Sequence, residues 1–189
     1  MKSESISNYS QPLFYRFSRD SVELATLAES LERGKKNLSI LEFFAGCGVV
    51  SLEFSSRHQS VKKITFVELQ ADFEHHLEEN VKQTSYDYDI QVKNFLDFES
   101  AEKFDVILAN PPYFSPNSSR LGQDQSRNLC RFEMNFNISD LVGKIENYLS
   151  PRGSAYICHR ENLEKLDNRI KKIGAYQAIG LFRFCLDID

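Results

Sequence analysis

Short apolar runs alternate with longer amphipathic stretches along most of the chain. The apolar runs are rich in β-branched and aromatic residues, a composition typical of strands buried on both faces of a parallel sheet. They lie at residues 37–43, 62–68, 90–95, 104–110 and 154–159. Apolar positions spaced three and four residues apart predict helices on either side of these runs. The predicted helices lie at residues 18–34, 70–83, 138–153 and 161–174.

Strand followed by helix, repeated along the chain, predicts an α/β fold with a doubly wound, mostly parallel sheet and right-handed crossovers. Such sheets bind ligands beyond the carboxyl ends of their strands, at the point where the strand order reverses. We therefore expect the functional residues directly after the strands.

Composition and charge narrow the class of protein. With 189 residues, 41% of them hydrophobic, the chain fits one domain with a sizeable core. Its four cysteines are widely spaced and form no CxxC pair, which argues against a disulfide framework and a metal site. There is no signal-peptide core and no apolar run of roughly 18 residues, so we expect a cytoplasmic protein without a membrane segment. The net charge of -4 means that any nucleic-acid site must be a local basic patch.

The loop after the first strand has the composition of a cofactor-binding loop. "LEFFAGCGVVS" places Glu42, Gly46 and Gly48 between a strand and a helix, where glycine lets the backbone approach a ligand. A dinucleotide fingerprint would need a third glycine at Ser51, and no Gly-Lys-Ser/Thr of a P-loop follows. Glu68 ends the second strand, where a carboxylate can accept both hydroxyls of a ribose, and Glu42 suits an ammonium group. Together they predict S-adenosylmethionine, although such a turn can also need glycine for structural reasons alone.

The fourth strand ends in "NPPY", residues 110–113, downstream of E-x-F-x-G-x-G. This combination resembles the amino-methylating class I S-adenosylmethionine-dependent methyltransferases, which have a Rossmann-like fold. The resemblance implies that the Asn110 side-chain oxygen and the Pro111 carbonyl accept hydrogen bonds from a target NH₂ group. It also implies that Tyr113 stacks on the planar group that carries the amine.

Elementary chemistry supports this arrangement independently. The lone pair of an exocyclic amine is delocalised, and two acceptors aimed at its hydrogens direct that lone pair toward a methyl donor by positioning and electrostatics. Pro111 and Pro112 have a fixed φ and no N–H, which keeps the carbonyl direction rigid. Tyr113 or Phe114 supplies a ring face, a contact worth roughly 1–3 kcal/mol per base. The alternative is that Asn-Pro merely ends a strand with a turn.

The resemblance also implies which residues contact the cofactor. These are Asp20, Glu42, Phe43, Gly46, Gly48, Glu68, Leu69, Asn94, Phe95 and Asn110. The family usually has an acidic residue after the third strand that binds the cofactor adenine. Asn94 stands at that position and can accept through its side-chain oxygen, with Asp97 as the alternative.

Three amines are candidates for the substrate: adenine N6 in nucleic acid, guanine N2 in ribosomal RNA, and a glutamine side chain in a protein. "FYRFSRDSVELAT", residues 14–26, resembles the bacterial tRNA adenine-N6 methyltransferases that modify valine tRNA, in which Asp20 and Ser21 would start a helix over the cofactor. Residues 131–133 resemble the Arg-His-Glu of the same group. Only 37 residues precede the first strand, which disfavours a release-factor type of enzyme. An RNA-binding module with this fold and no turnover is the non-enzymatic alternative.

Basic residues follow the Asn-Pro-Pro-Tyr stretch and favour the tRNA substrate. Arg120, Arg127 and Arg131 lie close in sequence to Tyr113 and Phe114, as a flipped base with flanking phosphates would require. An exposed polar loop is the alternative interpretation of these arginines.

The two ends of the chain complete the prediction. Residues 1–12 are expected to be a flexible segment and residues 13–189 the methyltransferase domain. Residues 176–189 have room for only one long strand, so we expect the C-terminal hairpin of the family's sheet to be truncated or its last strand absent. An unpaired edge of this kind promotes self-association, and a monomer or a weak homodimer is expected.

Overall fold

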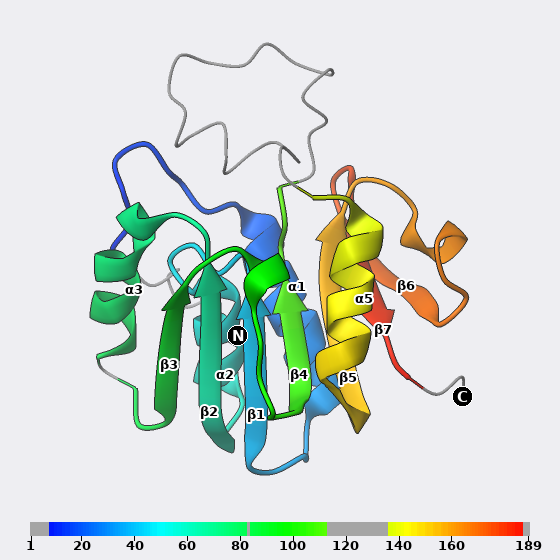
Figure 1. The fold of residues 1–189 in the computed structure, drawn as a ribbon, viewed down its shortest axis with the longest axis horizontal. Helices are drawn as coiled ribbons and strands as arrows, with labels where there is room; N and C mark the ends of the chain where they lie inside the picture. Colours follow the sequence, from blue (N-terminus) through cyan, green and yellow to red (C-terminus); the bar gives the residue numbers. More distant parts are fainter. Residues whose placement is uncertain (1–7, 83, 113–135, 187–189) are drawn as a thin grey trace, which may run out of the picture.

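The computed structural model describes residues 8–82, 84–112 and 136–186, which form a three-layer α/β fold around one sheet (Figure 1). The sheet has the strand order β3-β2-β1-β4-β5-β7-β6. The first five strands are parallel, whereas β7 is antiparallel to both β5 and β6. The strand order therefore reverses between β1 and β4, as the doubly wound prediction requires.

The elements have the following bounds. The strands are β1 (Leu38–Phe43), β2 (Val61–Glu68), β3 (Asp87–Val92), β4 (Phe104–Ala109), β5 (Leu149–His159), β6 (Ile170–Tyr176) and β7 (Ile179–Phe184). The helices are α1 (Arg19–Glu32), α2 (Val49–Arg57), α3 (Glu74–Val81) and α5 (Ile138–Tyr148). Three short 3₁₀ turns are η1 (Ala71–Phe73), η2 (Phe95–Asp97) and η3 (Leu163–Lys165).

Helices cover both faces of the sheet because its central strands are apolar on both faces. In β4, Val106 and Leu108 belong to the core cluster that contains residues of α1, α2 and α3, whereas Ile107 and Ala109 belong to the second cluster, with residues of α5. All four side chains are fully buried. This two-sided burial explains why the strands lack the alternation of a half-exposed sheet.

The fifth strand begins earlier than the sequence predicts. The helix expected at 138–153 ends at Tyr148, and Leu149 already pairs with Phe104 of β4. Gly153 was expected to end the helix, but it lies in β5 instead. A Cβ on it would come within 2.9 Å of the Phe104 carbonyl oxygen, so this glycine permits close approach of two strands.

The predicted helix at 161–174 is wrong. Within this range, only η3 is helical, and residues from Ile170 onward form β6, which pairs with β7. Arg169 bridges Asp167 and Glu146 and places its guanidinium 4.9 Å from the centre of the Phe184 ring. These long-range contacts outweigh the helical spacing of the apolar residues.

The expectation of a truncated C-terminal hairpin is also wrong. β6 and β7 form an antiparallel hairpin that pairs Ile170 with Phe184 and Tyr176 with Ile179. Gln177 adopts a φ of 52° in the turn between them. The hairpin has both strands because its first one comes from the segment that was expected to be helical.

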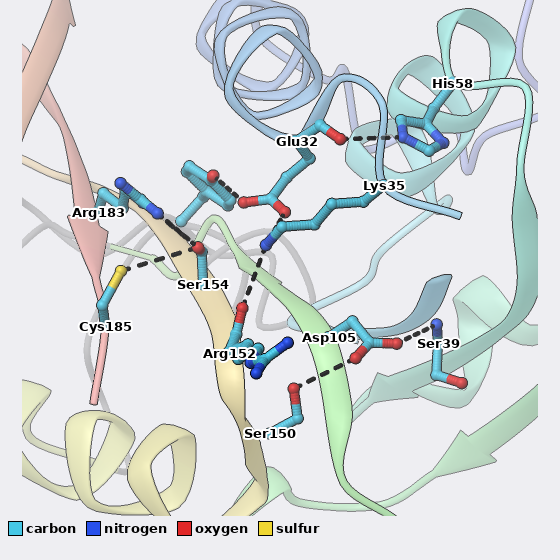
Figure 2. Close-up of polar contacts among 11 residues, drawn as sticks. Glu32, Lys35, Ser39, His58, Asp105, Ser150, Arg152, Ser154, Arg183 and Cys185 are labelled. Atoms are coloured by element: carbon cyan, nitrogen blue, oxygen red, sulfur yellow. Dashed lines mark hydrogen bonds and ion pairs between the residues drawn. The ribbon is translucent and has the colours of Figure 1, made fainter. Parts of the chain in front are cut away.

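Buried polar contacts hold the C-terminal end of α1 on the sheet (Figure 2). Glu32 is fully buried, accepts a hydrogen bond from the Tyr156 hydroxyl and lies 2.6 Å from the Lys35 ammonium. Burial and the adjacent Glu32 carboxylate raise the pKa of Tyr156 above its usual value. Arg183 of β7 donates to the Ser154 hydroxyl of β5 at 3.0 Å. The C-terminal end of α1 therefore has a defined position relative to β5.

Candidate active site

The carboxyl ends of β1, β2, β3 and β4 lie at one edge of the sheet (Figure 1), and the strand order reverses between β1 and β4. The loop after β1, Glu68 at the end of β2, Asn94 after β3 and Asn110 after β4 all lie at this edge. Parallel strands bring their carboxyl ends to one side, so residues far apart in sequence become neighbours.

The loop after β1 makes a tight turn that two glycines permit. Gly46 and Gly48 have φ values of 52° and 76°, in the left-handed region. A Cβ on Gly48 would lie 2.5 Å from Leu77 and 3.1 Å from Phe66, so a larger residue would also clash there. Phe44, in the same loop, has a φ of 58° although it is not glycine. Its ring packs 4.8 Å from that of Phe95 and 5.0 Å from that of Phe136, measured between ring centres.

Glu68 joins the loop after β1 to the loop after β2. Its carboxylate accepts hydrogen bonds from the backbone N–H of Gly46 at 2.8 Å and of Gln70 at 2.9 Å. Burial raises the pKa of Glu68, and these two hydrogen bonds oppose that rise. Each carboxylate oxygen retains a second acceptor direction, which fits a ribose diol at this edge.

Glu42 lies beneath the loop and is 1% exposed. Its carboxylate accepts a hydrogen bond from the backbone N–H of Ser51 at 3.0 Å. This N–H lies in the first turn of α2, where backbone donors have no partner within the helix. The N-cap residue, Gly48, has no side chain that could accept from it, so Glu42 takes over the capping role. Burial raises the pKa of Glu42 to about 8, and the nearby Glu68 carboxylate adds to the rise. The expected partner, an ammonium group, would favour the ionised form.

The loop after β3 places Asn94 directly at the site edge. The Asn94 side chain accepts the backbone N–H of Leu96 at 3.0 Å and thereby caps η2, and the residue is partly buried. Asp97, the alternative, is exposed at the end of η2. The position of Asn94 favours it over Asp97, and its contact with a cofactor adenine stays a prediction.

Four further predicted cofactor residues occupy different surroundings. The rings of Phe43 and Phe95 lie in the core, 5.7 Å apart between centres, with exposed fractions of 0% and 5%. Leu69, next to Glu68, is 44% exposed. Its exposed side chain could form an apolar surface against a planar group. Asp20 is fully buried at the start of α1, where its carboxylate accepts from the Ser18 hydroxyl and the Ser21 backbone N–H.

Asn110 follows β4 and is oriented by a contact from α1. Its amide nitrogen donates to the Ser21 hydroxyl oxygen at 2.8 Å. Its amide oxygen is buried and has no hydrogen-bond partner among the described residues. Pro111 is buried and Pro112 partly buried directly after it. The remaining predicted substrate residues, Tyr113, Phe114, Arg120, Arg127 and Arg131, lie outside the described residues.

An aromatic segment before α1 also reaches the site, which the sequence analysis did not anticipate in detail. Tyr15 packs edge-on against Phe73, with ring centres 5.0 Å apart, and its hydroxyl lies 3.7 Å from where a Cβ on Gly46 would be. Further toward the N-terminus, Tyr9 donates to Glu53 and the Ser10 backbone N–H donates to Asn80. The signal for this segment is the aromatic stretch "FYRF", residues 14–17.

Neither a metal-binding cluster nor a membrane-spanning helix occurs among the described residues. No group of three or more His, Cys, Asp or Glu side chains could hold a metal ion there. In the same part of the chain, no helix combines the length and apolarity needed to cross a membrane.

Comparisons with known proteins point to one class. Residues 16–126 match the family model described as the methyltransferase small domain. The chain is 27% identical over 140 residues to a tRNA1(Val) (adenine(37)-N6)-methyltransferase of Glaesserella parasuis, covering 72% of this chain and 58% of that protein. It is 31% identical over 124 residues to the enzyme of that name from Shewanella halifaxensis, covering 62% of this chain and 48% of that protein. The chain thus spans about half to two thirds of the length of these relatives.

Solved structures share the fold at low sequence identity. The ribosomal protein L11 methylase of Lactobacillus delbrueckii has a TM-score of 0.61 at 19% identity, over 89% of this chain and 79% of that one. A coclaurine N-methyltransferase bound to N-methylheliamine and SAH has a TM-score of 0.54 at 17% identity, over 80% of this chain and 39% of that one. At these identities the likeness concerns the fold alone.

Proposed function

We propose that this chain, which belongs to the methyltransferase small domain family, transfers a methyl group from S-adenosylmethionine to an exocyclic amine, adenine N6 in tRNA. The observation that carries the proposal is the Asn110 amide oxygen, which is buried and unpaired among the described residues. A buried acceptor without a donor costs free energy. A substrate N–H at this position would supply the missing donor.

The residues of the chain act on the amine by positioning it. The Asn110 oxygen and the Pro111 carbonyl accept the two amine hydrogens, which turns the nitrogen lone pair away from the conjugated ring and toward the donor methyl. Pro111 and Pro112 restrict the backbone and so fix the direction of the second acceptor, the Pro111 carbonyl. Catalysis by this arrangement requires no strong base. The nitrogen–methyl bond forms as the methyl–sulfur bond breaks, the sulfur leaves as a neutral thioether, and water then takes the proton from the methylated amine.

The residues at the sheet edge fit the proposed cofactor. Glu68 presents a buried carboxylate for the ribose hydroxyls, Glu42 lies beneath the loop where an ammonium would be placed, and Leu69 and Asn94 flank the position of the adenine. When bound, S-adenosylmethionine supplies an electrophilic methyl group.

The choice of adenine in tRNA rests on similarity to named relatives. The curated relatives reported above are named as tRNA adenine-N6 methyltransferases. Guanine N2 and a glutamine side chain present the same kind of NH₂ group, and the assays described below distinguish them from adenine N6. A tRNA substrate would place the reaction in the cytoplasm, and we propose that the protein works as a monomer or a weak homodimer.

Two measurements test the proposal. The first is titration with labelled S-adenosylmethionine; an absence of binding would contradict the enzyme and leave an RNA-binding module as the better account. The second is mass spectrometry of tRNA nucleosides after incubation with protein and cofactor, in which N6-methyladenosine is expected. Methylation of guanine N2 or of a protein glutamine instead would refute the substrate while retaining the amine chemistry.

The variant Asn110→Ala tests the role of the amide directly. It should lower the rate of methyl transfer by at least a hundredfold, since a transition-state acceptor contributes about that much. The affinity for S-adenosylmethionine should change little, because the loops after β1 and β2 remain intact. Unchanged activity of this variant would remove Asn110 from the mechanism.

A further inference from the structure

The start of α1 touches the proposed amine-binding residue through one side chain. Ser21 is 3% exposed, and its hydroxyl oxygen accepts the Asn110 amide N–H at 2.8 Å. The two residues are 89 positions apart in the sequence. This hydrogen bond uses the Asn110 amide nitrogen, and the amide oxygen has no partner among the described residues.

The direction of this hydrogen bond decides what Asn110 can bind. An asparagine amide has a donor nitrogen and an acceptor oxygen on the same carbon, so rotating it by half a turn exchanges the two. With the nitrogen bonded to Ser21, the oxygen faces away from α1 and can accept from an amine. In the opposite orientation two sets of N–H donors would face each other, and the amine would be repelled.

Ser21 is itself held in place by the first turn of α1. Its backbone N–H donates to the Ser18 carbonyl at 3.2 Å and to the Asp20 carboxylate at 2.8 Å. The Cys158 thiol of β5 donates to the Asp20 carbonyl oxygen, with 3.8 Å between sulfur and oxygen. This contact connects the first turn of α1 to the sheet beside β4. At its other end, α1 is held by Glu32 and Tyr156. The Ser21 hydroxyl is thus at a defined place relative to the end of β4.

We propose that Ser21 is a positioning residue for the reaction: its hydroxyl anchors the Asn110 amide nitrogen and so holds the side chain in the orientation in which its oxygen meets the target amine. This inference rests on the proposed function and deepens it. It places the start of α1 in the amine-binding half of the site.

The matched pair Ser21→Ala and Ser154→Ala tests the proposal. Ser154 is also fully buried and also accepts a side-chain N–H, from Arg183 at 3.0 Å, but it lies in β5 as part of the network in Figure 2. Ser21→Ala should lower kcat for methyl transfer by roughly ten- to a hundredfold, a typical cost of misplacing a reacting group. The Kd for S-adenosylmethionine should stay within about twofold of wild type. Ser154→Ala should leave kcat unchanged.

A spectroscopic readout makes the test independent of turnover. In a ¹H–¹⁵N spectrum, the Asn110 side-chain proton donated to Ser21 should move toward the position of a free amide in Ser21→Ala and stay in place in Ser154→Ala. Ser21→Thr, which keeps the hydroxyl, should restore both this signal and most of kcat.

A double-mutant cycle separates positioning from a merely structural role. If Ser21 acts through Asn110, adding Ser21→Ala to Asn110→Ala should cause no further loss of activity. Equal kcat for wild type and Ser21→Ala, or losses that add in the double variant, would overturn the inference. A wild-type protein that methylates nothing would instead refute the proposed function, and the Asn110 spectrum would still report whether Ser21 orients the amide.

Discussion

Burial of the two site glutamates has a consequence for stability that depends on pH. Glu42 has a pKa of about 8 in the folded protein against an ordinary value of 4.5, and burial is the main cause. A raised pKa means that the folded state holds a proton that the unfolded state releases. The contribution of Glu42 to the free energy of unfolding is therefore most favourable at pH values below about 4.5, and it falls as the pH rises toward 8. Glu68 shifts in the same direction.

We predict that the free energy of unfolding of the cofactor-free protein falls between pH 5 and pH 8, and that Glu42→Gln flattens this dependence. Glutamine can still accept the Ser51 N–H but cannot ionise. The substitution therefore removes up to about 1.4 kcal/mol per pH unit from the slope of the unfolding free energy against pH. Urea unfolding at several pH values measures the effect. Glu146→Gln is the control, because Arg169 lowers the pKa of Glu146 and places its titration below this range. Parallel profiles for wild type and Glu42→Gln would contradict the prediction.

Phe44 combines an unfavourable backbone with favourable ring contacts. A left-handed φ costs a non-glycine residue roughly 1–2 kcal/mol, and each aromatic pair returns about 0.5–1.5 kcal/mol. The Phe44 ring packs against Phe95 and Phe136, so the two effects are of similar size. The ring thus holds the loop after β1 in a conformation that phenylalanine alone would avoid.

We predict that Phe44→Gly is more stable than Phe44→Ala by about 1 kcal/mol, because both lose the ring but only alanine retains the strained φ. Phe98 provides the control: it packs in the same core at a φ of -69°, where alanine should be the more stable of the two replacements. Denaturant midpoints of the four variants measure both differences. If alanine is preferred at both positions, the strain at Phe44 is not significant.

At the scale of elements, the segment 161–174 is where the local sequence pattern and the observed structure disagree. Its leucines and isoleucines have helical spacing, and a short stretch of it, η3, is indeed a 3₁₀ turn. Ile170 is nevertheless fully buried in a strand opposite Phe184. Pairing with β7 supplies hydrogen bonds and burial that an isolated helix at the protein edge would lack. No local signal reports the presence of that partner strand.

The edge strand β6 carries features that oppose association. Lys171 and Lys172 are exposed on it, and the register shifts between Lys172 and Gly174. Charges and irregular pairing are common protections of a free sheet edge. The earlier reason to expect self-association, a missing hairpin strand, does not apply to this sheet.

We therefore predict that the protein elutes as a monomer in size-exclusion chromatography at high concentration and that Lys171→Val/Lys172→Val shifts it toward larger species. Lys36→Val/Lys82→Val, which removes the same charge from exposed positions outside the strands, should not. Concentration-dependent association of the wild type, or equal behaviour of both double variants, would argue against edge protection by Lys171 and Lys172.

For the whole molecule, the predicted Rossmann-like class I methyltransferase fold is confirmed by the strand order and by the solved structures that share it. The first five strands appear near their expected positions because their apolar runs are continuous and are bounded by turns. The C-terminal part was predicted poorly, since its strands depend on one another across the sheet.

Periodicity and turn chemistry act over a few residues, so the sequence predicts the alternation of strands and helices, the glycine loop after β1 and the Asn-Pro-Pro stretch after β4. The three-dimensional structure was needed to show that Ser21 contacts Asn110, that the Glu42 carboxylate lies under the start of α2, and that residues 170–176 form a strand. Such contacts join residues far apart in the chain. Their energies depend on burial and on exact distances, which no local pattern contains.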